Sequence, residues 1–303
     1  MTPPDIFDPV IGAAEMIDAD LRRIVAPNPS PMTCRGTNTY LLGARDLAVI
    51  DPGPDDPAHL EAILRALRPG QRISHILVTH AHLDHSALAP VLAAATDAPV
   101  LAYGDAGAGR SDVMQDLAAQ GLVGGGEGVD ARFAPDGVLQ DGARVGGAGW
   151  DLVAHWTPGH FGNHMCFAGK DHVFTGDLVM GWASSLVSPP DGDLSDFMAS
   201  CQKLRSLGAR IFHPGHGAPV IAPATRLDAL IRHRQARDAA IRDHLARGPA
   251  TAAELTTRIY TDTAPTLHRA AERNVLAHLI DLHARGLSAT EGPLSHAARF
   301  HLT

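Results

Sequence analysis

Residues 79–85 read Thr-His-Ala-His-Leu-Asp-His and place four side chains that can bind metal within six positions. An apolar run at residues 76–78 precedes them and predicts a strand that ends just before the first histidine. His80 and His82, two apart on an extended chain, project to the same side, and Asp84 with His85 can be directed at a second point nearby. One short segment therefore predicts a site for two adjacent metal ions, an arrangement that supports metal-assisted hydrolysis.

Three further candidate ligands each follow a strand-like run and a turn that contains glycine. Sites in α/β sheets lie at the carboxyl ends of strands, so we expect these side chains to converge with residues 79–85. The runs at residues 151–156, 172–175 and 209–212 lead to His160, Asp177 and His216.

Together the candidates supply five imidazoles and two carboxylates. Seven ligands are too many for one tetrahedral ion, but they suit two ions if one carboxylate bridges them. Nitrogen and oxygen donors without thiolate suit Zn, and also Mn or Fe. The expected cofactor is therefore a pair of divalent metal ions, with zinc first.

Other polar residues are candidates for supporting roles. His164 is a candidate for a place behind the ligands, and His213 is a candidate proton donor facing the substrate. His155 and His172 are expected to be ordinary strand residues. Three residues on loops are expected to border the pocket: Asn38, Ser184 and Ser185.

Alternating strands and helices must position these residues. Additional strands are predicted at 40–42, 47–50, 73–78 and 100–101. Helices are predicted at 57–67, which ends at a Pro-Gly turn, and at 84–92. Residues 104–147 are rich in Gly, Ala and Asp, and we expect a mobile insertion near a sheet edge with a hairpin around Asp136-Gly137 and Asp141-Gly142.

A change in pattern near Pro223 predicts two domains, 1–222 and 223–303. Helices are expected at 226–247, 251–259 and 265–285, with a capping-box pattern from Thr251 to Glu254. A Gly-Pro turn at 292–293 then separates two short segments. Three helices followed by a hairpin resemble a winged helix.

The composition fits an ordinary globular protein without a disulfide framework. The chain has 303 residues, a net charge of −8 and three widely spaced cysteines, which indicates a reducing compartment. The amino-terminal residues lack the pattern of a signal peptide, and no run is long and apolar enough to span a membrane. We therefore expect a cytoplasmic protein without a membrane partner.

Residues 223–303 hold 11 Arg and 8 acidic residues, a charge of +3, which fits a nucleic-acid surface or ordinary solvated helices.

These motifs, in this order, resemble the five motifs of the metallo-β-lactamase superfamily over roughly residues 20–222. The resemblance implies an αββα metallo-β-lactamase sandwich followed by a small winged-helix-like α domain. It also implies that His80, His82 and His160 hold one metal ion and that a second ion has its own ligand set. That second set is Asp84, His85 and His216, with Asp177 as the bridge and Asp51 of Asp51-Pro-Gly as an orienting residue behind the ligands.

Segments outside these motifs resemble the β-lactamase-like protein 2 group, which carries such a C-terminal domain. Its animal member is a mitochondrial endoribonuclease for single-stranded RNA, and related fungal members are thioesterases acting on a carrier protein. The resembling segments are residues 28–41, His233-Arg234, Leu255, Ile259-Tyr260, Leu267-His268 and 274–279.

The resemblance and the ligand count predict a dinuclear hydrolase whose nucleophile is a metal-bridging hydroxide, with Asp84 as its proton acceptor. The first expected substrate is single-stranded RNA, and the alternative is an acyl-carrier or acyl-CoA thioester. A third alternative is a winged-helix DNA-binding regulator without catalysis, which the intact ligand set disfavours. The C-terminal domain is also a candidate dimerisation or pocket-covering module, so a homodimer is left open.

Overall fold

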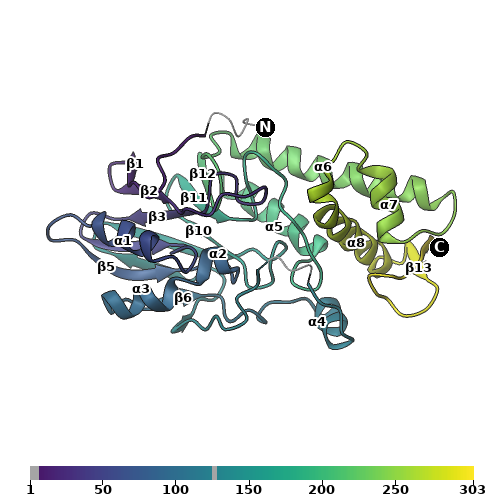
Figure 1. Cartoon of the computed structure of the whole chain (residues 1–303), viewed down its shortest axis with the longest axis horizontal. Coiled ribbons are helices and arrows are strands. Elements are labelled where there is room, and N and C mark those ends of the chain that lie inside the picture. Colours follow the sequence, from purple (N-terminus) through teal and green to yellow (C-terminus); the bar gives the residue numbers. More distant parts are fainter. Residues whose placement is uncertain (1–6, 125–127) are drawn as a thin grey trace.

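Two β-sheets form the centre of the molecule in the computed structural model, which describes residues 7–124 and 128–303 (Figure 1). The first sheet follows chain order, with antiparallel pairs as far as β4 and parallel pairs from β4 to β7. Its strands are β1 (Glu15–Asp18), β2 (Leu21–Val25), β3 (Asn38–Leu42), β4 (Asp46–Ile50), β5 (Arg72–Leu77), β6 (Val100–Ala102) and β7 (Gly137–Val138).

The second sheet has the order β12-β11-β10-β9-β8, and only β11 and β12 within it are parallel. Its strands are β8 (Arg144–Gly147), β9 (Trp150–Trp156), β10 (Met165–Ala168), β11 (His172–Gly176) and β12 (Ile211–Pro214).

Helices cover the outer face of each sheet. Those of the first 222 residues are α1 (Pro57–Arg65), α2 (Leu83–Ser86), α3 (Ala89–Thr96), α4 (Asp112–Ala119) and α5 (Leu194–Ser206). The C-terminal part contains α6 (Pro223–Leu245), α7 (Ala252–Ile259), the 3-10 helix η2 (Pro265–Leu267), α8 (His268–Ala284), β13 (Ser288–Thr290) and β14 (Phe300–Leu302).

Strand β4 shows how the layers arise from sequence. All five of its residues are buried, and successive side chains point to opposite faces. Leu47 and Val49 pack in the cluster formed with α1 and α3, whereas Ala48 and Ile50 pack against the second sheet. A strand covered on both faces must be apolar throughout, as this one is apart from its first residue.

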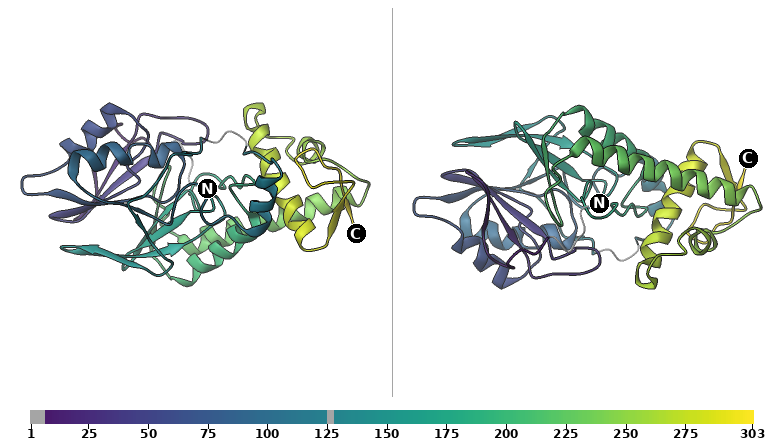
Figure 2. Two further views of the ribbon diagram at one scale, coloured as in Figure 1. Left: turned by 90° about the horizontal axis from the view of Figure 1, so that it is seen from below. Right: turned by 90° about the horizontal axis from the view of Figure 1, so that it is seen from above.

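The second sheet carries its own helical layer. Phe197 of α5 and Leu227 of α6 pack with Phe212 of β12 in one buried cluster. The helices lie outside the two sheets on opposite sides (Figure 2). The predicted αββα sandwich is therefore confirmed.

One predicted helix, 84–92, is divided in the structure. Helix α2 ends at Ser86 and α3 begins at Ala89. Pro90 lies in the first turn of α3, where its missing N–H costs nothing, whereas the same residue inside a continuous helix would remove a hydrogen bond.

The C-terminal part has three helices and a two-stranded antiparallel hairpin, as predicted for a winged helix. Thr251 and Glu254 form the expected capping box at the start of α7. Helix α6 contributes Leu227 to the core beside the second sheet and Ile241 to the C-terminal core. The domain division at 222/223 stays a prediction.

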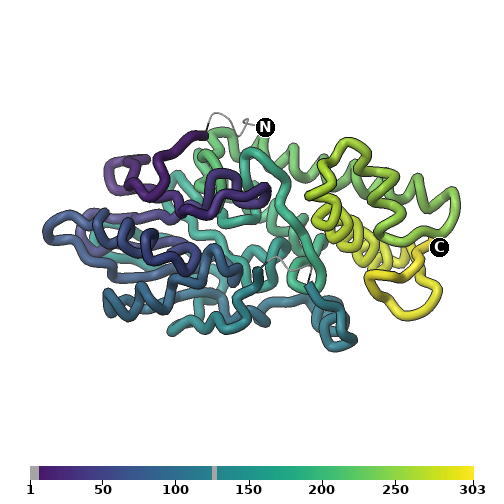
Figure 3. The backbone as a smooth tube through the Cα atoms, in the orientation of Figure 1, coloured from purple at the N-terminus to yellow at the C-terminus, as the bar shows by residue number. Residues whose placement is uncertain are grey.

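The predicted insertion near a sheet edge, residues 104–147, is only partly confirmed: β7 and β8 are edge strands, but α4 packs away from both sheets. Met114 and Leu117 of α4 are buried in the C-terminal core, and the chain path from the first sheet to this helix is visible in Figure 3. Strand β7 pairs with β6, so the expected hairpin around Asp136 and Asp141 is wrong. The hairpin forms instead between β8 and β9. Residues 125–127 lie outside the described part.

Within the described ranges, no helix combines the length and apolar character needed to cross a bilayer.

Candidate metal site

The loop after β5 presents four of the predicted ligands. Thr79 begins it, and Asp51 at the end of β4 receives hydrogen bonds from the Thr79 N–H at 2.7 Å and from its hydroxyl at 2.8 Å. Asp51 has a positive φ of 52°, which is uncommon outside glycine and indicates a constrained turn. The carbonyl of His82 accepts the N–H groups of His85 and Ser86, so the turn passes directly into α2.

All seven predicted ligands converge. They form three overlapping groups, and the ligand atoms within each group lie within 4.8 Å of one another. The groups are His80, His82 and His160; His80, His85 and Asp177; and Asp84, His85 and His216.

The first group brings three imidazole nitrogens face to face. His82 Nδ1 lies 2.8 Å from His80 Nε2 and 3.1 Å from His160 Nε2. Three ring nitrogens at such distances are suited to a shared cation, because each can direct a lone pair at it. This convergence agrees with the predicted set for one ion.

The other two groups add carboxylate oxygens. His216 Nε2 lies 3.3 Å from Asp84 Oδ2 and 3.2 Å from Asp177 Oδ2, and His85 Nε2 lies 3.5 Å from Asp177 Oδ1. Asp177 Oδ2 also lies 3.8 Å from His160 Nε2. Its Oδ1 is buried without a hydrogen-bond partner in the described residues. Asp177 thus lies between the three-histidine group and the group of Asp84, His85 and His216, at the place predicted for a ligand shared by two ions.

Contacts behind the cluster orient the rings. His85 Nδ1 donates to Asp51 Oδ2 at 2.9 Å, His160 Nδ1 to the Leu186 carbonyl at 2.7 Å, and His216 Nδ1 to the Gly36 carbonyl at 3.3 Å. A ring that donates through Nδ1 keeps Nε2 directed at the cluster. Asp51 therefore has the contact expected of the orienting residue that the sequence predicts.

The electrostatics of the cluster favour a bound cation. Burial opposes charge on every member, yet the flanking histidines lower the pKa of Asp84 and hold that of Asp177 well below its usual range. Burial lowers the pKa of His82 to about 3. Against the same burial, Asp177 and Asp84 raise the pKa of His216 to about 9. The carboxylate of Asp177, which is buried, and that of Asp84, which is partly exposed, thus attract positive charge, which divalent ions can supply in place of protons.

A cavity of about 430 Å³ opens above the cluster. Its floor carries five predicted ligands: His82, Asp84, His160, Asp177 and His216. The walls are mainly apolar, and none of the described residues that line it is Lys or Arg. One wall comes from the loop after β11 and the facing wall from the C-terminal part. The principal wall residues are Met32, Met180, Trp182, Leu186, Tyr260, Leu267, Ala270 and Ala271.

The sequence offered pocket covering as one role of the C-terminal domain, but it did not identify the residues that form this wall. Tyr260 and Leu267 belonged to the segments that carried the family resemblance, but nothing in their spacing placed them above the metal ligands. Their apolar character on short connecting segments was the available signal.

Other predicted residues have mixed outcomes. Ser184 lines the cavity. Asn38 is buried and donates to the carbonyls of Pro214 and Gly217 at 2.9 Å each, so it holds the loop of His216 instead of bordering the pocket. Ser185 is buried as well and donates to the Leu178 carbonyl.

Two further histidines differ in their position. His164 lies behind the ligands, with its ring centroid 5.3 Å from that of His80 and its Nδ1 3.1 Å from the Thr157 hydroxyl. His213 is buried against Tyr40 and Phe174, and burial lowers its pKa to about 3. The hypothesis that His213 faces the substrate is wrong, because its side chain points into the core between the sheets. His155 and His172 are strand residues, as predicted.

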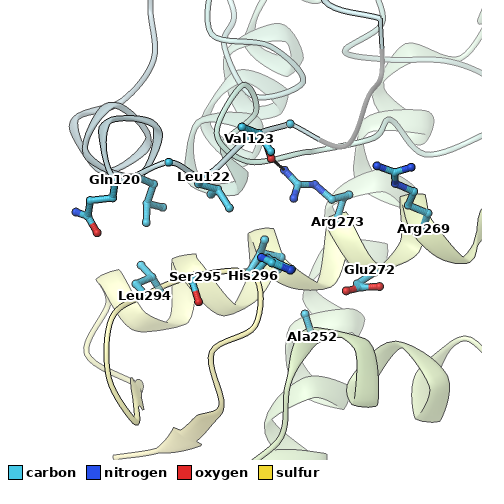
Figure 4. A pocket seen from close by; sticks show the side chains of 14 residues that line it. Gln120, Leu122, Val123, Ala252, Arg269, Glu272, Arg273, Leu294, Ser295 and His296 are labelled. Atoms are coloured by element: carbon cyan, nitrogen blue, oxygen red, sulfur yellow. Dashed lines mark hydrogen bonds between the residues drawn. The ribbon is translucent and has the colours of Figure 1, made fainter.

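A second cavity of about 370 Å³ lies between α4 and the C-terminal helices (Figure 4). Gln120 and Leu122 border one side, and Arg269, Arg273 and His296 the other. None of its lining residues belongs to the histidine and aspartate cluster, so it does not add to the metal site.

The sequence matches two protein families in succession. Residues 32–216 match the metallo-beta-lactamase superfamily, and residues 251–292 match the beta-lactamase associated winged helix domain.

Curated relatives come from fungi and animals. The chain is 31% identical over 238 residues to the atrochrysone carboxyl ACP thioesterase of Aspergillus fumigatus. The alignment covers 76% of this chain and 66% of that protein. It is 29% identical over 294 residues to the beta-lactamase-like protein 2 homolog of Drosophila melanogaster, covering 91% and 92%. The chain spans slightly less than two thirds of the length of the fungal relative.

Solved structures share the fold over nearly the whole chain. A metallo-beta-lactamase family protein from Thermus thermophilus superposes with a TM-score of 0.76 at 26% identity, covering 95% of this chain and 100% of that one. A beta-lactamase domain protein from Burkholderia ambifaria gives a TM-score of 0.80 at 21% identity, covering 100% and 99%.

Proposed function

The chain belongs to the metallo-beta-lactamase superfamily, and from this we propose that it is a dinuclear zinc hydrolase that cleaves thioesters with an apolar acyl group. Hydrolase chemistry and divalent metal binding follow from the family and the ligand cluster. The metal identity, the number of ions and the substrate are the parts that we propose.

The residues present fit two ions. His80, His82 and His160 would hold one, Asp84, His85 and His216 the other, and Asp177 both. When bound, the ions supply a nucleophilic water at neutral pH and polarise the electrophilic oxygen of the substrate. The nitrogen-rich donor set suits zinc.

Asp84 is the residue best placed to receive a proton. Its side chain is 26% exposed and faces the cavity, whereas the neighbouring His85 is fully buried. The Thr37 hydroxyl donates to Asp84 Oδ2 at 2.9 Å, which fixes the carboxylate. A carboxylate held in this way beside the cavity can accept the proton released as water attacks.

The single observation that carries the substrate class is the composition of the cavity wall. Proteins bind phosphodiester chains largely through Lys and Arg contacts to the phosphates, and the described lining contains neither residue. Trp182, Leu186 and Leu267 instead offer apolar surface to an acyl group. The thioesterase name of the Aspergillus fumigatus relative supports the same choice. RNA, the first expectation from sequence, becomes the second candidate.

DNA reading by the C-terminal part is disfavoured by the placement of α8, the third helix before the hairpin. Ala270, Ala271 and Asn274 of this helix line the catalytic cavity, and residues 275–280 are buried. Because this face of α8 already lines the cavity and packs in the core, it cannot also enter a DNA groove.

The test compares two substrates with zinc-loaded protein. We expect thiol release from the N-acetylcysteamine thioester of 2-naphthoic acid and no cleavage of end-labelled single-stranded RNA. Asp84→Ala should release no thiol, and the surface variant Asp151→Ala should match wild type, because its side chain is 71% exposed. RNA cleavage by wild type without thiol release would replace the proposal by a phosphodiesterase. Inactivity on both, with two zinc ions bound, would contradict the substrate class.

A further inference from the structure

The loop between β11 and α5 forms one wall of the catalytic cavity without regular secondary structure of its own. Its Leu186 carbonyl accepts the Nδ1–H of His160 at 2.7 Å. The orientation of one predicted ligand therefore depends on how this loop is held.

Side chains from α6 and α8 hold the loop. Four of them contact its backbone or a side chain within residues 180–188, so the C-terminal helices determine its path. Arg226 donates to the carbonyls of Met180 and Ala183, Arg234 to that of Ser185, Arg273 to the Ser188 hydroxyl, and Asn274 Oδ1 accepts the Val187 N–H.

Arg273 extends this attachment to the segment after α4. It also donates to the Val123 carbonyl at 3.1 Å, as the dashed line in Figure 4 shows. The loop is thus tied to α8 and, through Arg273, to the part of the chain that packs on the C-terminal core.

Arg234 is buried, with 2% of its surface exposed. Its guanidinium donates to Asn274 Oδ1 at 2.8 Å and to the Ser185 carbonyl, and lies 5.0 Å above the Phe197 ring. In the described part of the chain, no carboxylate forms an ion pair with it. Because burying a cation is costly unless polar atoms replace water, its contacts to the loop and to Asn274 must compensate for that cost.

One peptide unit joins Asn274 to His160. The Leu186 carbonyl and the Val187 N–H belong to the same planar group and point in opposite directions. Asn274 Oδ1 accepts that N–H at 3.1 Å, while the carbonyl accepts from His160. The Arg234 contact fixes the Asn274 oxygen, so rotation of the peptide is resisted from both sides.

We propose that Asn274 and Arg234 are positioning residues for His160, acting through the peptide between Leu186 and Val187. The C-terminal part then orients a metal ligand of the catalytic domain in addition to closing the cavity. This inference rests on the proposed function, since it concerns the ligand set for the first ion. It predicts that weakening the contact lowers metal affinity before it lowers substrate binding.

The test replaces Asn274 in two ways. Asn274→Ala removes the acceptor, and we expect the affinity for one of two zinc ions to fall about 10- to 100-fold, as for other residues that orient metal ligands. Asn274→Asp keeps an oxygen that can accept from Val187 and Arg234, so its affinity should stay within about threefold of wild type. Arg269→Ala, at an exposed position on the same helix, is the matched control.

Zinc affinity is measured by titrating metal-free protein in competition with a chromophoric chelator, and the unfolding temperature of each metal-free variant is recorded. In the thioester assay, Asn274→Ala should lower kcat with KM nearly unchanged. If Asn274→Ala does not fold, Arg234→Lys replaces it, with an expected loss of affinity of several-fold.

The outcomes separate the two proposals. Wild-type protein that binds no zinc would overturn the proposed function. Wild type with two bound ions, and Asn274→Ala or its replacement Arg234→Lys with unchanged affinity, would overturn only the positioning role. A fall in unfolding temperature without a loss of zinc affinity would also overturn it, because a purely structural contact gives that result.

Discussion

At the scale of single residues, the candidate metal site depends on three aspartates that differ in their neighbours and in their exposure to solvent. Asp177 lies between the two ligand groups, Asp51 orients His85 from behind, and Asp84 is the most exposed of the three. Three chemically identical side chains thus have three different tasks, which their different exposure and neighbours assign.

We predict that Asp84→Ala with two zinc ions bound has a kcat at least about 100-fold lower and an unfolding temperature little changed, because the substitution removes a proton acceptor at the cavity surface. Steady-state kinetics on zinc-loaded protein and thermal unfolding provide the measurements. Near-wild-type turnover in a variant with full zinc content would show that Asp84 is not the acceptor.

A second residue-scale prediction concerns stability at acid pH. Burial lowers the pKa of His59 to about 4, while an unfolded imidazole titrates near 6.5. Between these values the unfolded state binds more protons, so the contribution of His59 to stability is present at pH 7 and lost as the pH falls from 6.5 to 4. The loss reaches roughly 3 kcal/mol.

Denaturant unfolding between pH 7 and 4 measures this effect. His59→Gln cannot titrate, and its stability should fall less steeply with decreasing pH than that of wild type. Identical pH slopes for the two proteins would contradict the assignment, whatever the difference in their stability at pH 7.

At the scale of elements, short turns after strands present the ligands, and their glycines allow close approach. A Cβ on Gly215 would lie 2.4 Å from Asp177 Oδ1 and 2.6 Å from His85 Cε1. The Pro-Gly-His turn after β12 therefore requires glycine for packing, since the ligands of two other segments occupy the space of a side chain.

We predict that Gly215→Ala displaces Asp177 and lowers zinc affinity by at least about tenfold, comparable to the loss of an orienting contact. Chelator competition measures it. Gly107→Ala is the control, because an added Cβ there meets nothing closer than 3.4 Å. Equal affinities for both variants and wild type would show that the turn can shift to accept the methyl group.

At the scale of the whole molecule, the two halves share both core and site. Helix α6 contributes to two buried clusters, α4 packs in the C-terminal core, and Tyr260 and Leu267 form part of the cavity wall. The catalytic cavity is therefore a product of both parts of the chain and cannot be complete in either alone.

Metal removal should lower the stability of the whole structure. We predict that chelation lowers the unfolding temperature by several degrees and that zinc restores it, because ions that bind the folded state alone stabilise it. Without them the carboxylates of Asp84 and Asp177 depend on protonated His85 and His216 for compensation. An unfolding temperature that is unaffected by chelator and by added zinc would contradict a bound metal centre.

Sequence alone determined which candidate ligands converge and which strands form the layers. His80, His82, Asp84 and His85 are neighbours in the chain, and the other three candidates each follow a recognisable strand, so local spacing already restricted where they point. The apolar runs fixed the buried strands for the same reason, although β2, with Arg22 and Arg23 inside it, gave no such run.

Only the tertiary structure decided what surrounds the ligands. It buried His213, packed α4 against the C-terminal core, placed an apolar wall above the candidate ligands, and joined Asn274 to His160 across one peptide. These arrangements bring together residues that lie tens to more than a hundred positions apart. Their juxtaposition depends on sheet order and helix packing, which local spacing does not specify.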